Sequence, residues 1–71
     1  MATDVTAHIA GTVWKIEKKP GDSVSEGEPV LILECMKMEV PVESPAGGRL
    51  AQMRVAEGDE VEEGQVIATL E

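Results

Sequence analysis

Apolar residues along this chain occur in short runs, and glycine or proline interrupts each run. No stretch between these interruptions sustains the 3.6-residue apolar period of an amphipathic helix. Short apolar or alternating stretches bounded by glycine and proline are typical of many strands joined by turns. We therefore predict an all-β fold with strands over 5–9, 11–17, 29–34, 38–43, 48–55 and 66–70, and extended residues around Val24 and Val61.

An internal repeat relates the two halves of the chain. Residues 11–34 match residues 48–71 at an offset of 37 without a gap, with eight identities over 24 aligned pairs. Both copies contain Gly-Asp-x-Val-x-Glu-Gly, beginning at Gly21 and Gly58, which chance in an acidic, glycine-rich chain explains poorly. We expect two similar halves related by a pseudo-two-fold axis, neither able to bury its apolar face alone.

The alternation of a regular strand fails at the same place in both halves. Val13 and Ile16 are three residues apart, and their counterparts in the second half keep this spacing. One extra residue in a strand produces such a shift. The sequence therefore predicts β-bulges at 14–15 and 51–52.

The most distinctive stretch is Glu34-Cys35-Met36-Lys37-Met38-Glu39, which separates two β-prone runs. Two strands joined by so few residues form a tight hairpin, with Lys37 at or next to its tip. An exposed lysine at such a tip is more often only a solvated charge that discourages aggregation. Here Met36 and Met38 flank the lysine, and flexible apolar side chains around one charge favour a contact surface for other proteins.

The repeat also predicts where this lysine lies in the fold. Adding 37 to Lys37, or subtracting it, leads outside the chain. The pseudo-two-fold axis therefore pairs the lysine hairpin with the two chain ends. We expect Lys37 at the end of the domain opposite both termini.

Size and composition limit the core. The 71 residues read as a free-standing protein with one domain over 1–71, and a domain of this size buries only roughly 60% of its unfolded surface. Phe and Tyr are absent and there is a single Trp. We therefore expect a core of Val, Ile, Leu, Ala and Met.

The charge of the chain limits its partners. Fourteen acidic and six basic residues give a net charge of −8, which argues against nucleic acid or an anionic membrane as a partner, because both require basic patches. It favours partners with basic surfaces. No signal region or membrane-spanning apolar run is present, and a single cysteine fits a reducing compartment. We expect a cytoplasmic protein that is a monomer in isolation.

The hairpin stretch resembles the Glu-Ala-Met-Lys-Met motif of biotinyl carrier domains, the biotin carboxyl carrier family, with Cys35 in place of Ala. Glycine and hydrophobic spacing fit this family over residues 5–71. The resemblance implies a flattened barrel-sandwich hybrid of two four-stranded antiparallel sheets. It implies that biotin is attached covalently to Lys37, and that Met36 and Met38 are flanking recognition residues.

The resemblance also implies the partners of the lysine. A free lysine amine is protonated at neutral pH and a poor nucleophile, so Lys37 suits a substrate rather than a catalyst. In the family, biotin protein ligase joins biotin to the lysine from biotinyl-adenylate. The attached biotin then carries carboxylate from a biotin carboxylase to a carboxyltransferase, here of an acyl-CoA carboxylase of the acetyl-CoA type. The tether raises the effective concentration at both enzymes.

Three alternatives remain open. A lipoyl carrier domain of a 2-oxo acid dehydrogenase or glycine-cleavage type system has a similar fold, but usually has Asp where Met36 stands here. A structural protein could keep the motif unmodified, and an autonomous enzyme would need an acid–base pair that the sequence does not offer.

A metal site would rest on His8 and Cys35 alone, and Trp14 is expected to pack over one end of the barrel rather than to bind a partner.

Overall fold

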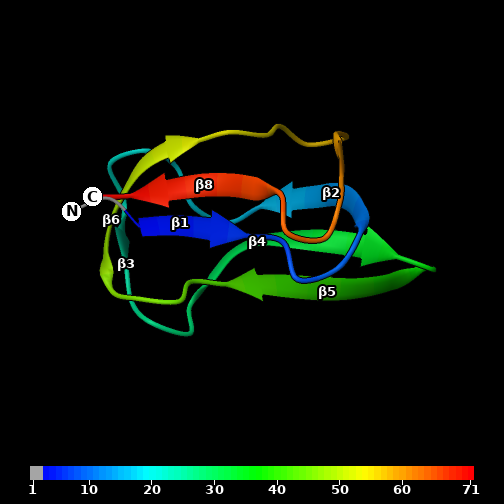
Figure 1. Cartoon of the computed structure of the whole chain (residues 1–71), viewed down its shortest axis with the longest axis horizontal. Coiled ribbons are helices and arrows are strands. Elements are labelled where there is room, and N and C mark those ends of the chain that lie inside the picture. The colour runs from blue at the N-terminus through cyan, green and yellow to red at the C-terminus, as the bar shows by residue number, and fades with distance from the viewer. Residues whose placement is uncertain (1–2) are drawn as a thin grey trace.

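The chain folds into two four-stranded antiparallel sheets in a computed structural model that describes residues 3–71 (Figure 1). The strands are β1 (Thr3–Thr6), β2 (Gly11–Ile16), β3 (Ser23–Val24), β4 (Pro29–Cys35), β5 (Met38–Glu43), β6 (Gly48–Met53), β7 (Glu60–Val61) and β8 (Val66–Leu70). Their order is β1-β8-β6-β3 in one sheet and β5-β4-β2-β7 in the other. The predicted all-β sandwich is confirmed, and no helix of a length and apolarity to cross a membrane occurs within 3–71.

The offset of 37 residues relates the two sheets strand by strand. It maps β1, β2, β3 and β4 onto β5, β6, β7 and β8, so the repeat extends beyond 11–34 and 48–71 to include the first strand and its twin. The turns obey the same relation. The Gly21 N–H donates to the carbonyl oxygen of Leu50 at 2.7 Å, and the Gly58 N–H donates to that of Val13 at 2.8 Å. Each half therefore completes the backbone hydrogen bonding of the other.

The predicted bulges are present in both halves. In β2 the register against β4 shifts between Val13 and Lys15, and in β6 the register against β8 shifts between Leu50 and Gln52. A second symmetric pair of bulges was not predicted, at Val30 and its twin Ile67. An uninterrupted apolar run conceals an extra residue because it shows no break in alternation.

The first strand differs from its predicted span of 5–9. It ends at Thr6, since Ala7 already bonds to the turn before β8. The Ala7 N–H donates to the carbonyl oxygen of Gln65 at 2.9 Å, and the Gly64 N–H donates to that of Ala7 at 2.8 Å. Residues beyond Ala7 are thus directed across the end of the sandwich instead of along the sheet.

The core lies between the two sheets and consists of small and medium aliphatic side chains. Its buried members are Val5, Ala7, Val13, Val24, Val30, Leu31, Leu33, Val42, Leu50, Val61, Ile67, Ala68 and Leu70. Of the methionines in 3–71, only Met53 packs against this core, while Met36 and Met38 are exposed. The expectation that Trp14 packs over one end of the barrel is wrong. The residue is 48% exposed and is not among those that pack against the core.

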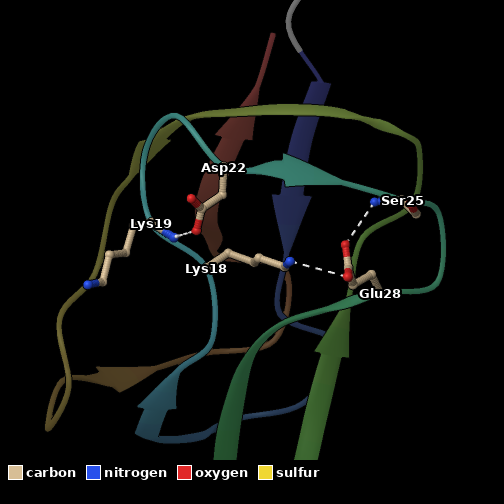
Figure 2. Close-up of polar contacts among 5 residues, drawn as sticks. All are labelled: Lys18, Lys19, Asp22, Ser25 and Glu28. Atoms are coloured by element: carbon tan, nitrogen blue, oxygen red, sulfur yellow. Dashed lines mark hydrogen bonds and ion pairs between the residues drawn. The ribbon is translucent and has the colours of Figure 1, made fainter.

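Side-chain acceptors hold the turns between the short strands (Figure 2). The carboxylate of Asp22 accepts a hydrogen bond from the Lys19 N–H at 2.9 Å, and Asp59 bonds in the same way to Ala56. Aspartate stabilises turns through such bonds to nearby backbone. The Gly-Asp pairs recognised in the sequence therefore form two equivalent turns.

The next turn in each half shows an informative difference. Oε1 of Glu28 accepts a bond from the Ser25 N–H at 3.0 Å, and Oε2 lies 3.2 Å from Nζ of Lys18 (Figure 2). In the second half the equivalent acceptor is neutral, because Oε1 of Gln65 accepts a bond from the Glu62 N–H at 3.0 Å. An amide therefore performs the same structural role as a carboxylate at this position.

We predict that Glu28→Gln makes the stability of the protein less sensitive to acid. The Ser25 N–H, and after it Lys18, lower the pKa of Glu28 from its ordinary value of 4.5. A carboxyl with a lowered pKa stabilises the fold at pH values above its unfolded pKa, and that contribution disappears as the pH falls through the folded pKa. Urea unfolding between pH 3 and pH 7 should show a shallower decline below about pH 4.5 in the variant.

Glu26→Gln is the matched control, because no hydrogen bond or ion pair of Glu26 occurs within the described residues. The Glu26→Gln variant should show the same fall in the free energy of unfolding below about pH 4.5 as the wild type. If the free energy of unfolding of Glu28→Gln falls with acid as steeply as that of the wild type, the stabilising role of the Glu28 carboxylate is contradicted.

Candidate functional site

The lysine predicted at the hairpin tip lies within a two-residue turn between β4 and β5. Cys35 and Met38 are the last cross-strand pair, and Met36 and Lys37 form the turn with φ angles of 52° and 65°. A two-residue loop with positive φ at both positions is a type I′ turn, whose twist matches the flanking strands. Asn-Gly is the favoured pair there, and other residues cost about 1–2 kcal/mol each in the left-handed region.

The turn presents its side chains to solvent. Met36 is 91% exposed and Met38 is 65% exposed, and Lys37 is exposed between them. Within residues 3–71, no ion pair or side-chain hydrogen bond involves the Lys37 amine. The tip projects from the end of the molecule opposite both termini, as predicted (Figure 1). The amine is therefore free to enter the active site of another protein.

We predict that Met36→Asn raises the free energy of unfolding by about 0.5–1 kcal/mol, because asparagine tolerates positive φ far better than methionine. The exposed Met36 side chain contributes little packing that the change could remove. Met38→Asn is the control, since Met38 has no positive φ, and it should give no gain. Denaturant unfolding measures both, and a Met36→Asn protein no more stable than wild type would contradict the assigned strain.

Strain retained at an exposed position suggests a function for the side chains found there. The sequence could relieve this strain with asparagine and glycine, yet it has Met36 and Lys37. Neither side chain serves the core, because both are in solvent. The turn is therefore the strongest candidate for a functional site in residues 3–71.

The base of the hairpin is held closely against β2. A Cβ atom added at Gly11 would lie 2.8 Å from the carbonyl oxygen of Glu34 and 3.6 Å from Cβ of Cys35. A glycine at this crossing lets the backbones approach. Cys35 is a half-buried free thiol, which agrees with a small residue being required before the turn. The sequence contained a signal for this contact, because Gly11 is an identity of the repeat.

A hollow of about 570 Å³ adjoins the Met36 side of the turn. Its lining residues are Ala10, Gly11, Thr12, Glu34, Cys35, Met36, Glu60, Val61, Glu62 and Gln65. His8 lines a different hollow, between β1 and β5. The structure therefore does not bring His8 and Cys35 to one site, and residues 3–71 contain no group of three or more potential metal ligands.

The geometry fits a covalently carried group. Such a group needs one reachable primary amine, and the unpaired Lys37 at the far end of a rigid hairpin provides it. The structure places the three residues predicted from the motif, Met36, Lys37 and Met38, together in solvent. Sequence reasoning missed the left-handed backbone of the turn, because Met and Lys give no signal for it.

Comparisons with known proteins agree with this reading. The sequence profile of a family described as "Biotin-requiring enzyme" matches residues 1–70. The chain is 41% identical over 66 residues to the biotin/lipoyl attachment protein of Bacillus subtilis, covering 93% of this chain and 90% of that protein. It is 42% identical over 60 residues to the biotin carboxyl carrier protein of acetyl-CoA carboxylase from Solanum lycopersicum, covering 84% and 86%.

Solved structures show the same fold. The urea carboxylase of Kluyveromyces lactis matches with a TM-score of 0.92 and 31% identity over 99% of this chain. The match spans only 6% of that much longer enzyme, so it concerns one segment of a carboxylase.

Proposed function

This chain belongs to the biotin/lipoyl attachment family, and we propose that it carries biotin on Lys37 for an acyl-CoA carboxylase. Biotin is the covalently attached group of its carrier relatives, and related segments occur in carboxylases. The observation that supports Lys37 is its place in a strained, exposed two-residue turn opposite both termini. The similarity to a carrier of acetyl-CoA carboxylase supports the acyl-CoA type.

The chain contributes the tether and not the catalysis. The Nζ atom of Lys37 loses a proton to a biotin protein ligase and attacks the carboxyl carbon of biotinyl-adenylate. A C–N bond forms, the bond to AMP breaks, and loss of a second proton from Nζ leaves an amide. Bound biotin supplies a ureido nitrogen that can hold a carboxyl group between a biotin carboxylase and a carboxyltransferase. The sandwich keeps Lys37 away from the chain ends, so one rigid body can present it to each enzyme in turn.

The methionines beside the lysine provide the recognition surface in this proposal. Their flexible side chains can adapt to the ligase and to the carboxylase components, which differ in shape. Met36 also stands where lipoyl domains usually have an aspartate, which favours biotin over lipoate.

A parallel modification experiment tests this proposal. Unmodified protein is incubated with biotin, ATP and biotin protein ligase, and separately with lipoate, ATP and lipoate ligase. We expect one biotinyl increment on a peptide containing Lys37 and no lipoyl increment. We also expect Met36→Asp/Met38→Ala to slow biotin transfer without lowering the free energy of unfolding, because both side chains are exposed. Efficient lipoylation without biotinylation would contradict the proposal and favour the lipoyl alternative.

A further inference from the structure

The pseudo-two-fold axis allows the outer faces of the two sheets to be compared position by position. On the lysine-bearing sheet, Lys15, Ile32 and Pro41 are cross-strand neighbours on β2, β4 and β5, and Trp14 is the extra residue of the bulge beside them. Trp14 is 48% exposed, Pro41 is exposed and Ile32 is half-buried. We call Trp14, Ile32 and Pro41 the apolar row.

The twin of this row is polar. The offset of 37 maps Trp14, Ile32 and Pro41 onto Ala51, Thr69 and Asp4, and Thr69 is the cross-strand neighbour of Asp4 as Ile32 is of Pro41. The two rows share strand order, register and bulge. The sheet β1-β8-β6-β3 folds with Ala, Thr and Asp at these positions. The sandwich therefore does not require apolar residues at the equivalent positions of the sheet β5-β4-β2-β7. Exposed aromatic and aliphatic groups that the fold does not need mark a protein contact.

Charged side chains adjoin the apolar row. Lys15, the cross-strand neighbour of Ile32, is paired with Glu17, whose Oε1 lies 3.5 Å from Nζ of Lys15. Towards the turn, Glu60, Thr12, Glu34 and Glu39 are consecutive cross-strand neighbours across β7, β2, β4 and β5. Glu34 and Glu39 lie directly opposite one another. Like charges in that position destabilise a sheet, so this pair does not serve the stability of the fold.

In the twin sheet the corresponding positions of Glu60 and Thr12 are Ser23 and Arg49, so no such acidic row forms. An acidic row beside an apolar one is complementary to an apolar patch edged by arginine or lysine. A second copy of this chain, with a net charge of −8, would be repelled.

The distance from the turn favours one kind of enzyme. Pro41 follows Lys37 by four residues, which corresponds to roughly 13 Å along a strand. A ligase must bring the Lys37 amine itself to its reaction centre, so its closest contacts lie at the turn. An enzyme that acts on the group carried by Lys37 does not have to bind the amine itself, so its contacts can extend along the sheet to the apolar row.

We propose that the apolar row is the docking surface for the biotin carboxylase, which meets it with an apolar patch edged by basic side chains. This inference rests on the proposed function, because it assigns a second contact to the protein that acts on the loaded Lys37. The turn presents the carried group, and the row holds the body of the carrier while the group is in the active site.

The test replaces each residue of the row by its twin, in Trp14→Ala/Ile32→Thr/Pro41→Asp, and uses the biotin-loaded protein. With biotin carboxylase from the same organism, we expect the KM for the carrier to rise about tenfold or more and kcat to stay within about twofold. The ligase should load this variant at the wild-type rate. Trp14→Ala alone, which keeps the net charge, should give part of the same rise in KM.

Gln52→Ala/Thr69→Ala, on the outer face of the other sheet, is the matched control and should leave both reactions unchanged. A wild-type KM with the triple variant would overturn the inference, as would a defect confined to the ligase reaction. Wild-type protein that the ligase loads but the carboxylase never carboxylates would overturn the proposed function and the inference together. A wild-type KM with the triple variant thus counts against the docking surface alone, whereas a wild-type carrier that is never carboxylated counts against the carrier function.

Discussion

Lys37→Arg will abolish loading with biotin and leave the protein folded. The guanidinium of arginine keeps the positive charge but offers no amine that the ligase can acylate. The fold is unaffected because Lys37 is exposed and has no hydrogen-bonding or ionic partner within residues 3–71. Mass spectrometry after incubation with ligase, biotin and ATP should show no increment on the variant, while its unfolding midpoint matches wild type.

Lys18→Arg and Lys19→Arg are the controls for this prediction. Both lysines lie beside the Gly-Asp turn that begins at Gly21, where the Lys19 N–H bonds to Asp22 (Figure 2). Each variant should be loaded as fast as wild type. Biotin on the Lys37→Arg protein would show that another lysine is the acceptor and would contradict the assignment of the site.

Leu33→Ala will remove about half of the stability of the domain. Leu33 is completely buried between the sheets, and such a truncation costs about 2–5 kcal/mol. A domain of 71 residues has a total stability of about 4–10 kcal/mol, and this chain has one cysteine and so no internal disulfide to support it. Denaturant unfolding at 25 °C should show the loss as a lower unfolding midpoint with an unchanged m-value.

The symmetry of the core gives this prediction an internal comparison. Leu70 is the twin of Leu33 and is 1% exposed, so Leu70→Ala should cost the same to within about 1 kcal/mol. Leu33→Met, which nearly conserves volume, should cost less than about 1.5 kcal/mol. A Leu70→Ala protein that unfolds like wild type would contradict the equivalence of the two halves.

The sequence was most informative where the two halves repeat each other. The Gly-Asp turns and the bulges at 14–15 and 51–52 were predicted because each irregularity occurs twice, which chance rarely produces. The place of Lys37 opposite the termini followed from the same offset. The bulges at Val30 and Ile67 were missed, since continuous apolar runs hide an added residue.

The chemical details of the site depended on three-dimensional context. The motif located Lys37, but only the backbone angles show that Met36 and Lys37 occupy strained left-handed positions. The exposure of Trp14 could not be read from its own residue type, since tryptophan is apolar and more often buried. It became interpretable through the twin Ala51, whose sheet folds without an aromatic residue at that position.

The intact mass of the protein purified from its native host, with fragmentation to locate any added group, tests the carrier function most directly. We predict one biotinyl increment, located on Lys37. A lipoyl increment at Lys37 would contradict the assignment of biotin. An unmodified chain from a host with active biotin protein ligase would contradict the carrier function itself.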